Sequence, residues 1–290
     1  MKLIVKFNLV FVLVFLLGLV AAGYVSRNLL QENAREEIAQ NARLVMEAAL
    51  ATRSYTSTQV QPLLAERMQH EFLPQSVPAY SATEVFHSLR ETFPEYSYKE
   101  ATLNPTNPRD RATDWETDIV NHFRNDPAAD EVVGERDTPS GGSFFIARPI
   151  QVKSESCLTC HTTVEAAPPT MVDLYGPANG FGWQMNEIIG AQIVSVPTDV
   201  PLARANAAFR TFMTSLTLVF AFIFIVLNFM LYFLVIRPVT RLSGVADSVS
   251  RGELGTPEYE VRARDEIGVL SESFNRMRKS LVQAMRMLEE

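Results

Sequence analysis

Two long uncharged segments dominate the pattern of hydrophobic and polar positions. Residues 7–26 and 211–236 contain no Asp, Glu, Lys or Arg and consist mainly of Val, Leu, Ile and Phe. About 20 such residues are enough to cross a bilayer as a helix, so the pattern predicts two transmembrane helices. The first segment also fits a secretory signal peptide, because Lys2 and Lys6 precede it and small residues occupy 21–23. In both interpretations the region between the two segments is exported.

The basic residues beside these segments predict the orientation of the chain. Two lysines precede the first segment, and Arg237 and Arg241 follow the second. Because basic residues concentrate on the cytoplasmic side of membrane helices, we expect a two-pass protein of the bacterial inner membrane. The predicted parts, in chain order, are a cytoplasmic N-terminus (1–6), a transmembrane helix (7–26), a periplasmic domain (27–210), a second transmembrane helix (211–236) and a cytoplasmic helical pair (237–290).

The periplasmic region reads as one α+β domain. Apolar residues recur at helical spacing over 28–60, which predicts a long helix that runs on from the first membrane segment. Residues 142–152 and 188–197 are rich in Ile, Val and Phe and predict two strands. A long N-terminal helix that leads into a small antiparallel sheet is typical of PAS-like or Cache-like extracytoplasmic domains. With 15 Lys and Arg against 24 Asp and Glu over 25–211, this region is acidic and is not expected to bind nucleic acid.

Both cysteines of the chain lie in the motif Cys157-Leu158-Thr159-Cys160-His161. Cys-x-x-Cys-His is the attachment motif for c-type haem: each thiol adds to a vinyl group, and the histidine offers a nitrogen to the iron. A zinc site would need further soft ligands, and a thioredoxin-like motif a cytosolic βαβ setting. A disulfide across two residues would stabilise little. The motif therefore predicts one covalent haem c, with Cys157 and Cys160 as attachment sites and His161 as an axial ligand, on a loop after residues 154–156.

Several further segments carry a resemblance to a known family. These are residues 98–109, 112–116, 147–150, 157–161, 180–183 and 187–191. Together they resemble a bacterial family of periplasmic c-type haem sensor domains, formerly of unknown function and often found ahead of HAMP, kinase or cyclase modules. The resemblance covers about residues 30–205. It implies a PAS-like fold with one covalently held haem and a role in redox or gas sensing.

The second axial position of the iron stays open at this stage. No third cysteine exists, and the candidate ligands are His70, favoured among them, and His87, His122, Met46, Met68, Met171 and Met185. An open iron binds diatomic gases, whereas two strong ligands favour redox sensing or electron transfer.

Other residues are candidates for contacts with the haem. Arg109, Arg111 and Arg148 are candidate partners of the haem propionates, because guanidinium groups pair with carboxylates, although surface salt bridges are an equal alternative. Trp183 and Tyr175 are candidates to line the haem face.

The segment after the second membrane helix predicts a pair of amphipathic helices. Pro238 follows the membrane and can start a helix. An apolar stripe then runs to the break at 252–255, and Asp265-Glu266 opens a second helix, whose heptad pattern runs from Ile267 to Leu288. This pair resembles a HAMP linker, which implies a parallel homodimer forming a four-helix bundle. The alternative is a plain juxtamembrane coiled coil.

The leading functional hypothesis is a membrane-anchored haem receptor that senses redox state or a small gas. Residues 237–290 contain no kinase histidine box, nucleotide-binding pattern or cyclase motif, so we expect no enzyme and a signal passed to a separate cytoplasmic protein. The alternative is an electron-transfer cytochrome, or an accessory haem subunit of a membrane redox complex.

Overall fold

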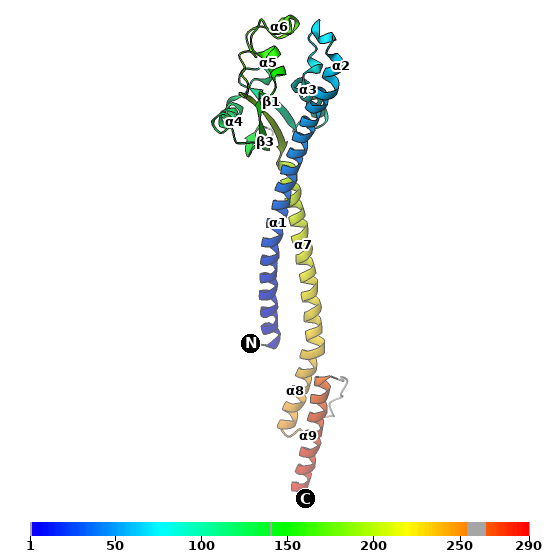
Figure 1. Ribbon diagram of the computed structural model, residues 1–290. Helices are drawn as coiled ribbons and strands as arrows, with labels where there is room; N and C mark the ends of the chain where they lie inside the picture. The colour runs from blue at the N-terminus through cyan, green and yellow to red at the C-terminus, as the bar shows by residue number, and fades with distance from the viewer. Residues whose placement is uncertain (1, 140, 254–264, 290) are drawn as a thin grey trace. The chain divides into compact units, whose positions relative to one another are not determined.

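The computed structural model describes residues 2–139, 141–253 and 265–289 (Figure 1). The chain divides into two compact units. One unit, Arg27–Ala208, is called the α+β domain below. The other unit consists of Met1–Ser26 and Phe209–Glu290. Each unit is described by itself.

The chain begins with one long helix, as the hydrophobic pattern predicts. Helix α1 (Leu3–Tyr55) continues into the π-helix η1 (Thr56–Val60) and the short helix α2 (Gln61–Leu64). The hydroxyl groups at residues 56–58 donate to carbonyls four residues earlier, at 2.8 to 3.0 Å, a pattern that bends helices. Pro62, which lacks an N–H, follows directly and explains why the regular ladder changes here.

Four antiparallel strands form the sheet of the α+β domain. They are β1 (Ser97–Thr102), β2 (Val132–Thr138), β3 (Gly141–Gln151) and β4 (Ile188–Pro197), in the spatial order β1-β4-β3-β2. The predicted strands 142–152 and 188–197 correspond to β3 and β4 and are confirmed. The hydrophobic pattern does not predict β1 and β2, because both are edge strands with polar sequences, SYKEAT and VVGERDT.

Helices cover both faces of this sheet. Helices α1 and α3 (Pro78–Thr92) pack on one face, and α4 (Asp114–Asn125) packs on the other. The alternation of a strand divides the side chains between them. On β4, Val194 and Val196 join the first cluster, whereas Ala191 and Ile193 join the second. The α+β fold class predicted from the sequence is therefore confirmed.

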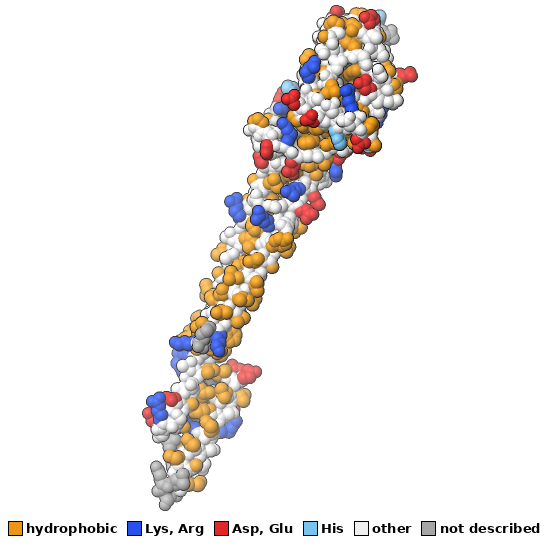
Figure 2. Space-filling model, turned by 90° about the vertical axis from the view of Figure 1, so that its left-hand side faces the viewer, with side chains coloured by type: hydrophobic (Ala, Val, Ile, Leu, Met, Phe, Trp, Pro, Cys, Tyr) orange, Lys and Arg blue, Asp and Glu red, His pale blue; other side chains and the backbone are white. Residues whose placement is uncertain are grey.

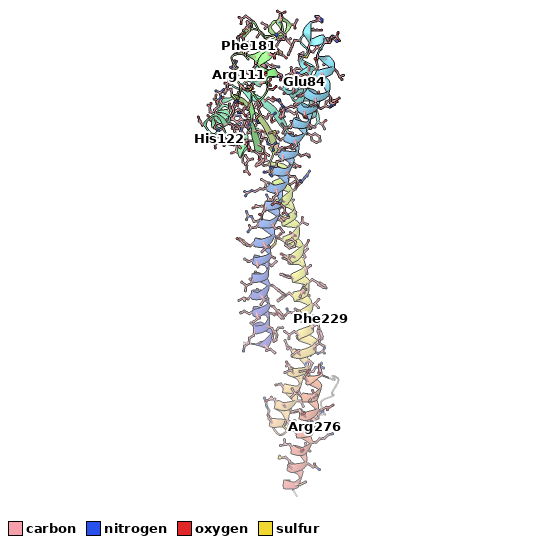
Figure 3. The ribbon with its side chains drawn as sticks, in the orientation of Figure 1. Glu84, Arg111, His122, Phe181, Phe229 and Arg276 are labelled. Atoms are coloured by element: carbon pink, nitrogen blue, oxygen red, sulfur yellow. The ribbon has the colours of Figure 1, made fainter. Side chains whose placement is uncertain are left out.

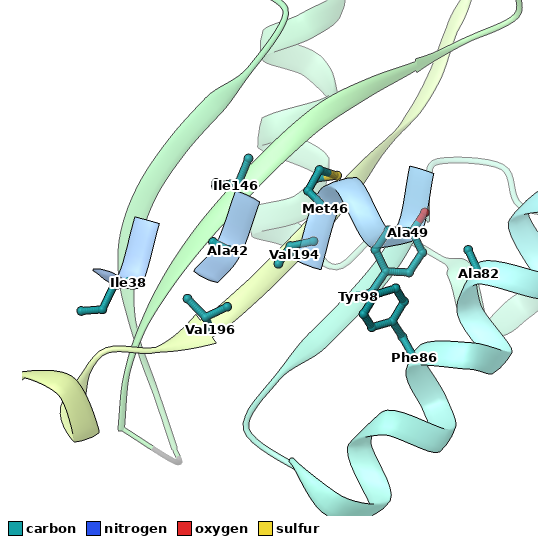
Figure 4. Close-up of a cluster of buried hydrophobic side chains, with 10 residues drawn as sticks. All are labelled: Ile38, Ala42, Met46, Ala49, Ala82, Phe86, Tyr98, Ile146, Val194 and Val196. Carbon is teal, nitrogen blue, oxygen red and sulfur yellow. The ribbon is translucent and has the colours of Figure 1, made fainter. Parts of the chain in front are cut away.

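The α1 face of the sheet holds the larger core cluster, which Figure 4 shows in close-up. Four residues of the predicted α1 stripe are buried in it: Ile38, Ala42, Met46 and Ala49. Their spacing of four, four and three residues puts them on one side of the helix. The stripe is thus a packing face, and Met46 is one of its fully buried members.

A buried ion pair also ties α1 to the sheet. The guanidinium of Arg53 on α1 binds both carboxylate oxygens of Glu100 on β1, whose side chain is only 6% exposed. The hydroxyl of Tyr98 donates to the same carboxylate at 2.6 Å. Burial and then the negative charge of Glu100 raise the pKa of Tyr98 well above its ordinary value, so its hydroxyl keeps the proton that it donates.

The substitution Glu100→Ala tests this ion pair. We expect it to lower the free energy of unfolding of the α+β domain by about 3 kcal/mol, because it leaves a largely buried guanidinium without its partner. Urea unfolding followed by circular dichroism measures the loss. The control Glu71→Ala removes the exposed Arg67–Glu71 pair, which is worth at most about 1 kcal/mol. Equal losses in the two variants would contradict the assignment.

Two helical stretches are long and apolar enough to cross a membrane, Leu3–Leu64 and Asp199–Ser250. They contain the two predicted membrane segments. The second stretch consists of α7 (Asp199–Met230), the π-helix η5 (Leu231–Ile236) and α8 (Arg237–Ser250). Within this unit the rings of Phe15 and Phe220 stack with centroids 5.0 Å apart. Figure 2 shows hydrophobic side chains gathered along the pair of helices formed by the first part of α1 and by α7.

Helix α8 and helix α9 (Glu266–Glu289) form the predicted helical pair. Leu242 and Val249 of the α8 stripe are buried. The carboxylate of Asp265 accepts a hydrogen bond from the amide of Gly268 at 3.0 Å and so caps the start of α9. Residues 254 and 255 of the predicted break, and the side chain of Leu288 in the heptad pattern, lie outside the described residues.

Candidate functional site

The Cys-x-x-Cys-His motif lies on a short helix, α5 (Glu155–His161), and not on the loop that the sequence predicts. Ser154 caps this helix, since its hydroxyl accepts from the amide of Ser156 at 3.2 Å. Helical spacing of three and four residues brings the side chains of Cys157, Cys160 and His161 to one side of α5. Both cysteines are free thiols and half-buried. Burial and then the neighbouring Cys157 raise the pKa of the Cys160 thiol.

The imidazole of His161 is held in one tautomer. Its Nδ1 lies 2.7 Å from the carbonyl oxygen of Gly180. A carbonyl only accepts, so Nδ1 carries the proton and donates it. Burial lowers the pKa of His161, while the bond to Gly180 opposes this shift. The neutral ring therefore leaves Nε2 with a free lone pair, which is the form of histidine that binds a metal ion.

Trp183 stacks on this imidazole. The two ring centroids are 3.8 Å apart, and the ring planes are inclined by 15°. Two backbone bonds fix the tryptophan relative to α5: the amide of Trp183 donates to the carbonyl of His161 at 3.1 Å, and that of Gly182 donates to the carbonyl of Thr162 at 2.8 Å. The stack therefore belongs to a backbone-anchored turn.

Asn104 anchors the same turn from the other side. Its side-chain oxygen accepts from the amide of Gly180 and its amide group donates to the carbonyl of Phe181, both at 3.2 Å. Thr106 lies two residues on, with its hydroxyl 3.4 Å from Nδ1 of His161. We call His161, Asn104, Thr106, Gly180 and Trp183 the histidine cluster.

The segments of the histidine cluster are among those that carry the family resemblance, but the sequence predicts no role for Asn104, Thr106 or Gly180. Two local signals mark these segments: an Asn followed by Pro at 104–105, and two glycines flanking Phe181. Each signal predicts a turn. Neither predicts that the two turns meet.

Gly180 is the tightest point of the cluster. Its φ is +87°, and an added Cβ would lie 2.1 Å from the Thr106 hydroxyl and 2.8 Å from the Thr106 Cα. Gly182 has a similar φ of +81°, but an added Cβ there would meet nothing within 4 Å. A substitution at either glycine therefore strains the backbone, but only a substitution at Gly180 also collides with Thr106.

The pair Gly180→Ala and Gly182→Ala tests this close approach. Both variants carry the strain of a left-handed backbone, about 1 to 3 kcal/mol. We expect Gly180→Ala to lose more free energy of unfolding than Gly182→Ala, because only the former displaces Thr106. Urea unfolding measures both losses. Equal losses would show that the two turns do not pack as described.

The three predicted propionate partners lie in different surroundings. Arg111 donates to the side chain of Asn179 at 3.2 Å, next to the histidine cluster; Figure 3 labels Arg111 and Phe181 in this part of the domain. Arg109 pairs with Glu84 at 2.5 Å. The guanidinium of Arg148 binds Glu47 at 2.7 Å and Glu131 at 3.1 Å. Their roles toward a haem stay predictions, and of the three guanidinium groups only that of Arg111 has a described bond beside the cluster.

The predicted second axial ligands are scattered. His70, His87 and His122 are exposed, and Met46 and Met171 are buried, Met46 in the core beneath the sheet. The segment of His70 reaches α6 (Pro169–Tyr175), because the amide of Phe72 donates to the Thr170 hydroxyl at 2.8 Å. Among the described residues no three His, Cys, Asp or Glu groups gather as a metal-binding set. The second axial ligand of the iron therefore stays a prediction.

A charged group, Asp110, lies close to the segment that carries Thr106. The Asp110 carboxylate is 3.6 Å from Nε of Arg109. Burial is the main cause that raises the pKa of Asp110 to about 6; Arg109 and Lys99 oppose the rise, and Glu100 adds to it. The folded domain therefore holds a proton at Asp110, between about pH 4 and 6, that the unfolded chain has already released.

This raised pKa predicts a pH dependence of stability. The folded state binds the extra proton, so the contribution of Asp110 to stability is greatest below about pH 4 and falls as the pH rises to about 6. We expect Asp110→Asn to exceed the wild type by about 3 kcal/mol in free energy of unfolding at pH 7, and to come close to it near pH 4. Urea unfolding across this pH range measures the difference. Asp118→Asn, at an exposed position of α4, is the charge-matched control; the same pH profile in both variants would contradict the prediction.

Comparisons with known proteins place these features in families. A HAMP domain matches residues 230–283. The Heme sensor protein HssS of Staphylococcus aureus strains JH9 and Newman is 39% identical over 79 residues, which are 27% of this chain and 17% of the length of that relative. The crystal structure of the cyanobacterial heme-protein Tll0287 gives a TM-score of 0.42 at 16% identity, over 56% of this chain and 95% of that one, and supports no conclusion by itself. The family Tll0287-like (Tll0287) matches residues 31–197, more than half of the chain, and the chain belongs to this family.

Proposed function

We propose that the chain is a membrane-anchored receptor that carries one haem c, attached through Cys157 and Cys160 and ligated by His161. The observation that carries the proposal is the hydrogen bond from Nδ1 of His161 to Gly180, because it leaves Nε2 free for a metal. Two half-buried free thiols, Cys157 and Cys160, lie four residues and one residue before this ligand, the spacing of the thioether attachment motif. The family takes its name from Tll0287, a cyanobacterial heme-protein.

The chemistry of a bound haem would be one-electron redox change or the binding of a small ligand. The protein's own residues supply the setting. His161 would ligate the iron, the turn at 180–183 holds its ring, and Arg111, which donates to Asn179 beside this turn, would be available to pair with a propionate. We infer that the opposite side of the iron is either open or held by a residue such as His70.

The proposed topology puts the α+β domain in the bacterial periplasm and both termini in the cytoplasm. The basic residues Lys2, Lys6, Arg237 and Arg241 support it. The HAMP match supports signal transfer across the membrane by a parallel homodimer, in which two packings of the helices differ in energy by little. We propose that the receptor is not an enzyme and passes its signal to a separate cytoplasmic protein.

The covalent haem is tested by substitution within α5. Purified wild type from cells that mature c-type cytochromes is expected to carry haem that survives denaturation, seen by haem staining and by the pyridine haemochrome spectrum. Cys160→Ser leaves one thioether bond and shifts that spectrum, and Cys157→Ser with Cys160→Ser loses all covalent haem. Thr159→Ala, at an exposed position of the same helix, is expected to keep it. A wild-type protein without covalent haem overturns the proposal.

The same preparation separates the two kinds of function. A large spectral change when the reduced protein meets CO indicates an available iron position and favours gas sensing. No change indicates two strong protein ligands and favours redox sensing, or the rival function of electron transfer to a membrane complex. The rival also requires that electron flow through a partner enzyme depends on this haem.

A further inference from the structure

We infer that Trp183 is a positioning residue that lowers the reduction potential of the haem iron, by stacking its indole on the imidazole of the ligand His161. The inference rests on the proposed function, since it concerns the ligand of the same haem. It names a residue that is not itself a ligand.

The two rings of the stack lie nearly parallel and in close contact. The ring planes of His161 and Trp183 are inclined by only 15°, and their centroids, 3.8 Å apart, are the closest of the ring pairs among the described residues. The other tryptophan, Trp115, meets Phe145 edge-on at 5.4 Å, which is an ordinary packing contact.

The backbone holds the two rings in register. The amide of Trp183 donates to the carbonyl of His161 itself, so the two residues are joined through main chain as well as through their rings. Asn104 pins the turn at Gly180 and Phe181. These bonds fix the backbone of both residues, and the bond from Nδ1 to Gly180 holds the imidazole ring itself.

Electrostatics determine whether the stack raises or lowers the reduction potential. The π face of an indole is negative and attracts positive charge. A metal-bound imidazole is more positive when the metal is in its higher oxidation state, so Trp183 stabilises the oxidised site more than the reduced one. The Nδ1 bond to Gly180 acts in the same sense, because it raises the basicity of the ligand. Both contacts lower the reduction potential.

A purely structural role would move the potential the other way. If Trp183 only filled space, its removal would admit water to the ligand, and water stabilises the more highly charged, oxidised state. The sign of the change therefore distinguishes tuning by the stack from loss of packing.

The test uses the full chain with its haem, and reads the midpoint potential by spectroelectrochemistry. We expect Trp183→Leu to weaken the preference for the oxidised state by about threefold to tenfold, the usual worth of an aromatic pair. A tenfold change for one electron is a positive shift of about 59 mV. Trp183→Phe keeps a π face and is expected to shift the potential less. Trp115→Leu, the matched control, is expected to leave it unchanged. An unchanged or more negative potential in Trp183→Leu overturns the inference.

A second measurement keeps the inference independent of haem loading. In full-length protein purified without haem and labelled with ¹⁵N at histidine, we expect the His161 signals to show protonated Nδ1 and unprotonated Nε2. Trp183→Leu is expected to shift the signals of the His161 ring, and to leave those of exposed His122 in place. Unmoved His161 signals overturn the inference, whereas a wild type that takes up no haem overturns only the proposed function.

Discussion

The approach of β1 to β4 at Gly190 is the constraint on which the α+β domain and its site both depend. Gly190 pairs with Thr102 in the sheet, and a Cβ there would lie 2.4 Å from the carbonyl oxygen of Ala101. Only glycine allows the ends of these two strands to lie so close. The segment that leaves β1 then reaches the turn at Gly180 with the side chain of Asn104.

The topology of the sheet explains why three distant segments meet. Strands β1 and β3 both run antiparallel to β4, so their last residues, Thr102 and Gln151, lie beside its first residues. The segment with Asn104, the helix α5 and the turn before β4 therefore all emerge at one end of the sheet (Figure 1). Strand β4, one of the two inner strands, is buried from Ile188 to Val194, so close packing holds this end of the sheet together.

Much of this architecture could be predicted from local patterns, and the rest could not. Periodicity and composition predict the apolar stripe of α1 and the strands β3 and β4. The residue types and spacing of Cys-x-x-Cys-His predict the haem motif. Short and polar elements such as β1 and α5 carry no such pattern. The bond between Asn104 and Gly180 joins residues 76 positions apart, and the pairing of Arg53 with Glu100 joins residues 47 apart. Contacts of this kind form only once the sheet is complete, so patterns of neighbouring residues do not predict them.

The contrast between a contiguous motif and a dispersed histidine cluster has a consequence for the order of assembly. Attachment chemistry at 157–161 needs five neighbouring residues, which an extended nascent chain already presents. The ring partners of His161, Gly180 and Trp183, lie further along the chain, and Asn104 can hold their turn only when β1 has paired with β4; non-local pairing of this kind is slow. A haem attached as proposed would thus reach its final reduction potential only after its thioether bonds have formed. Maturation and function are then separate events in time, with the folding of the sheet between them.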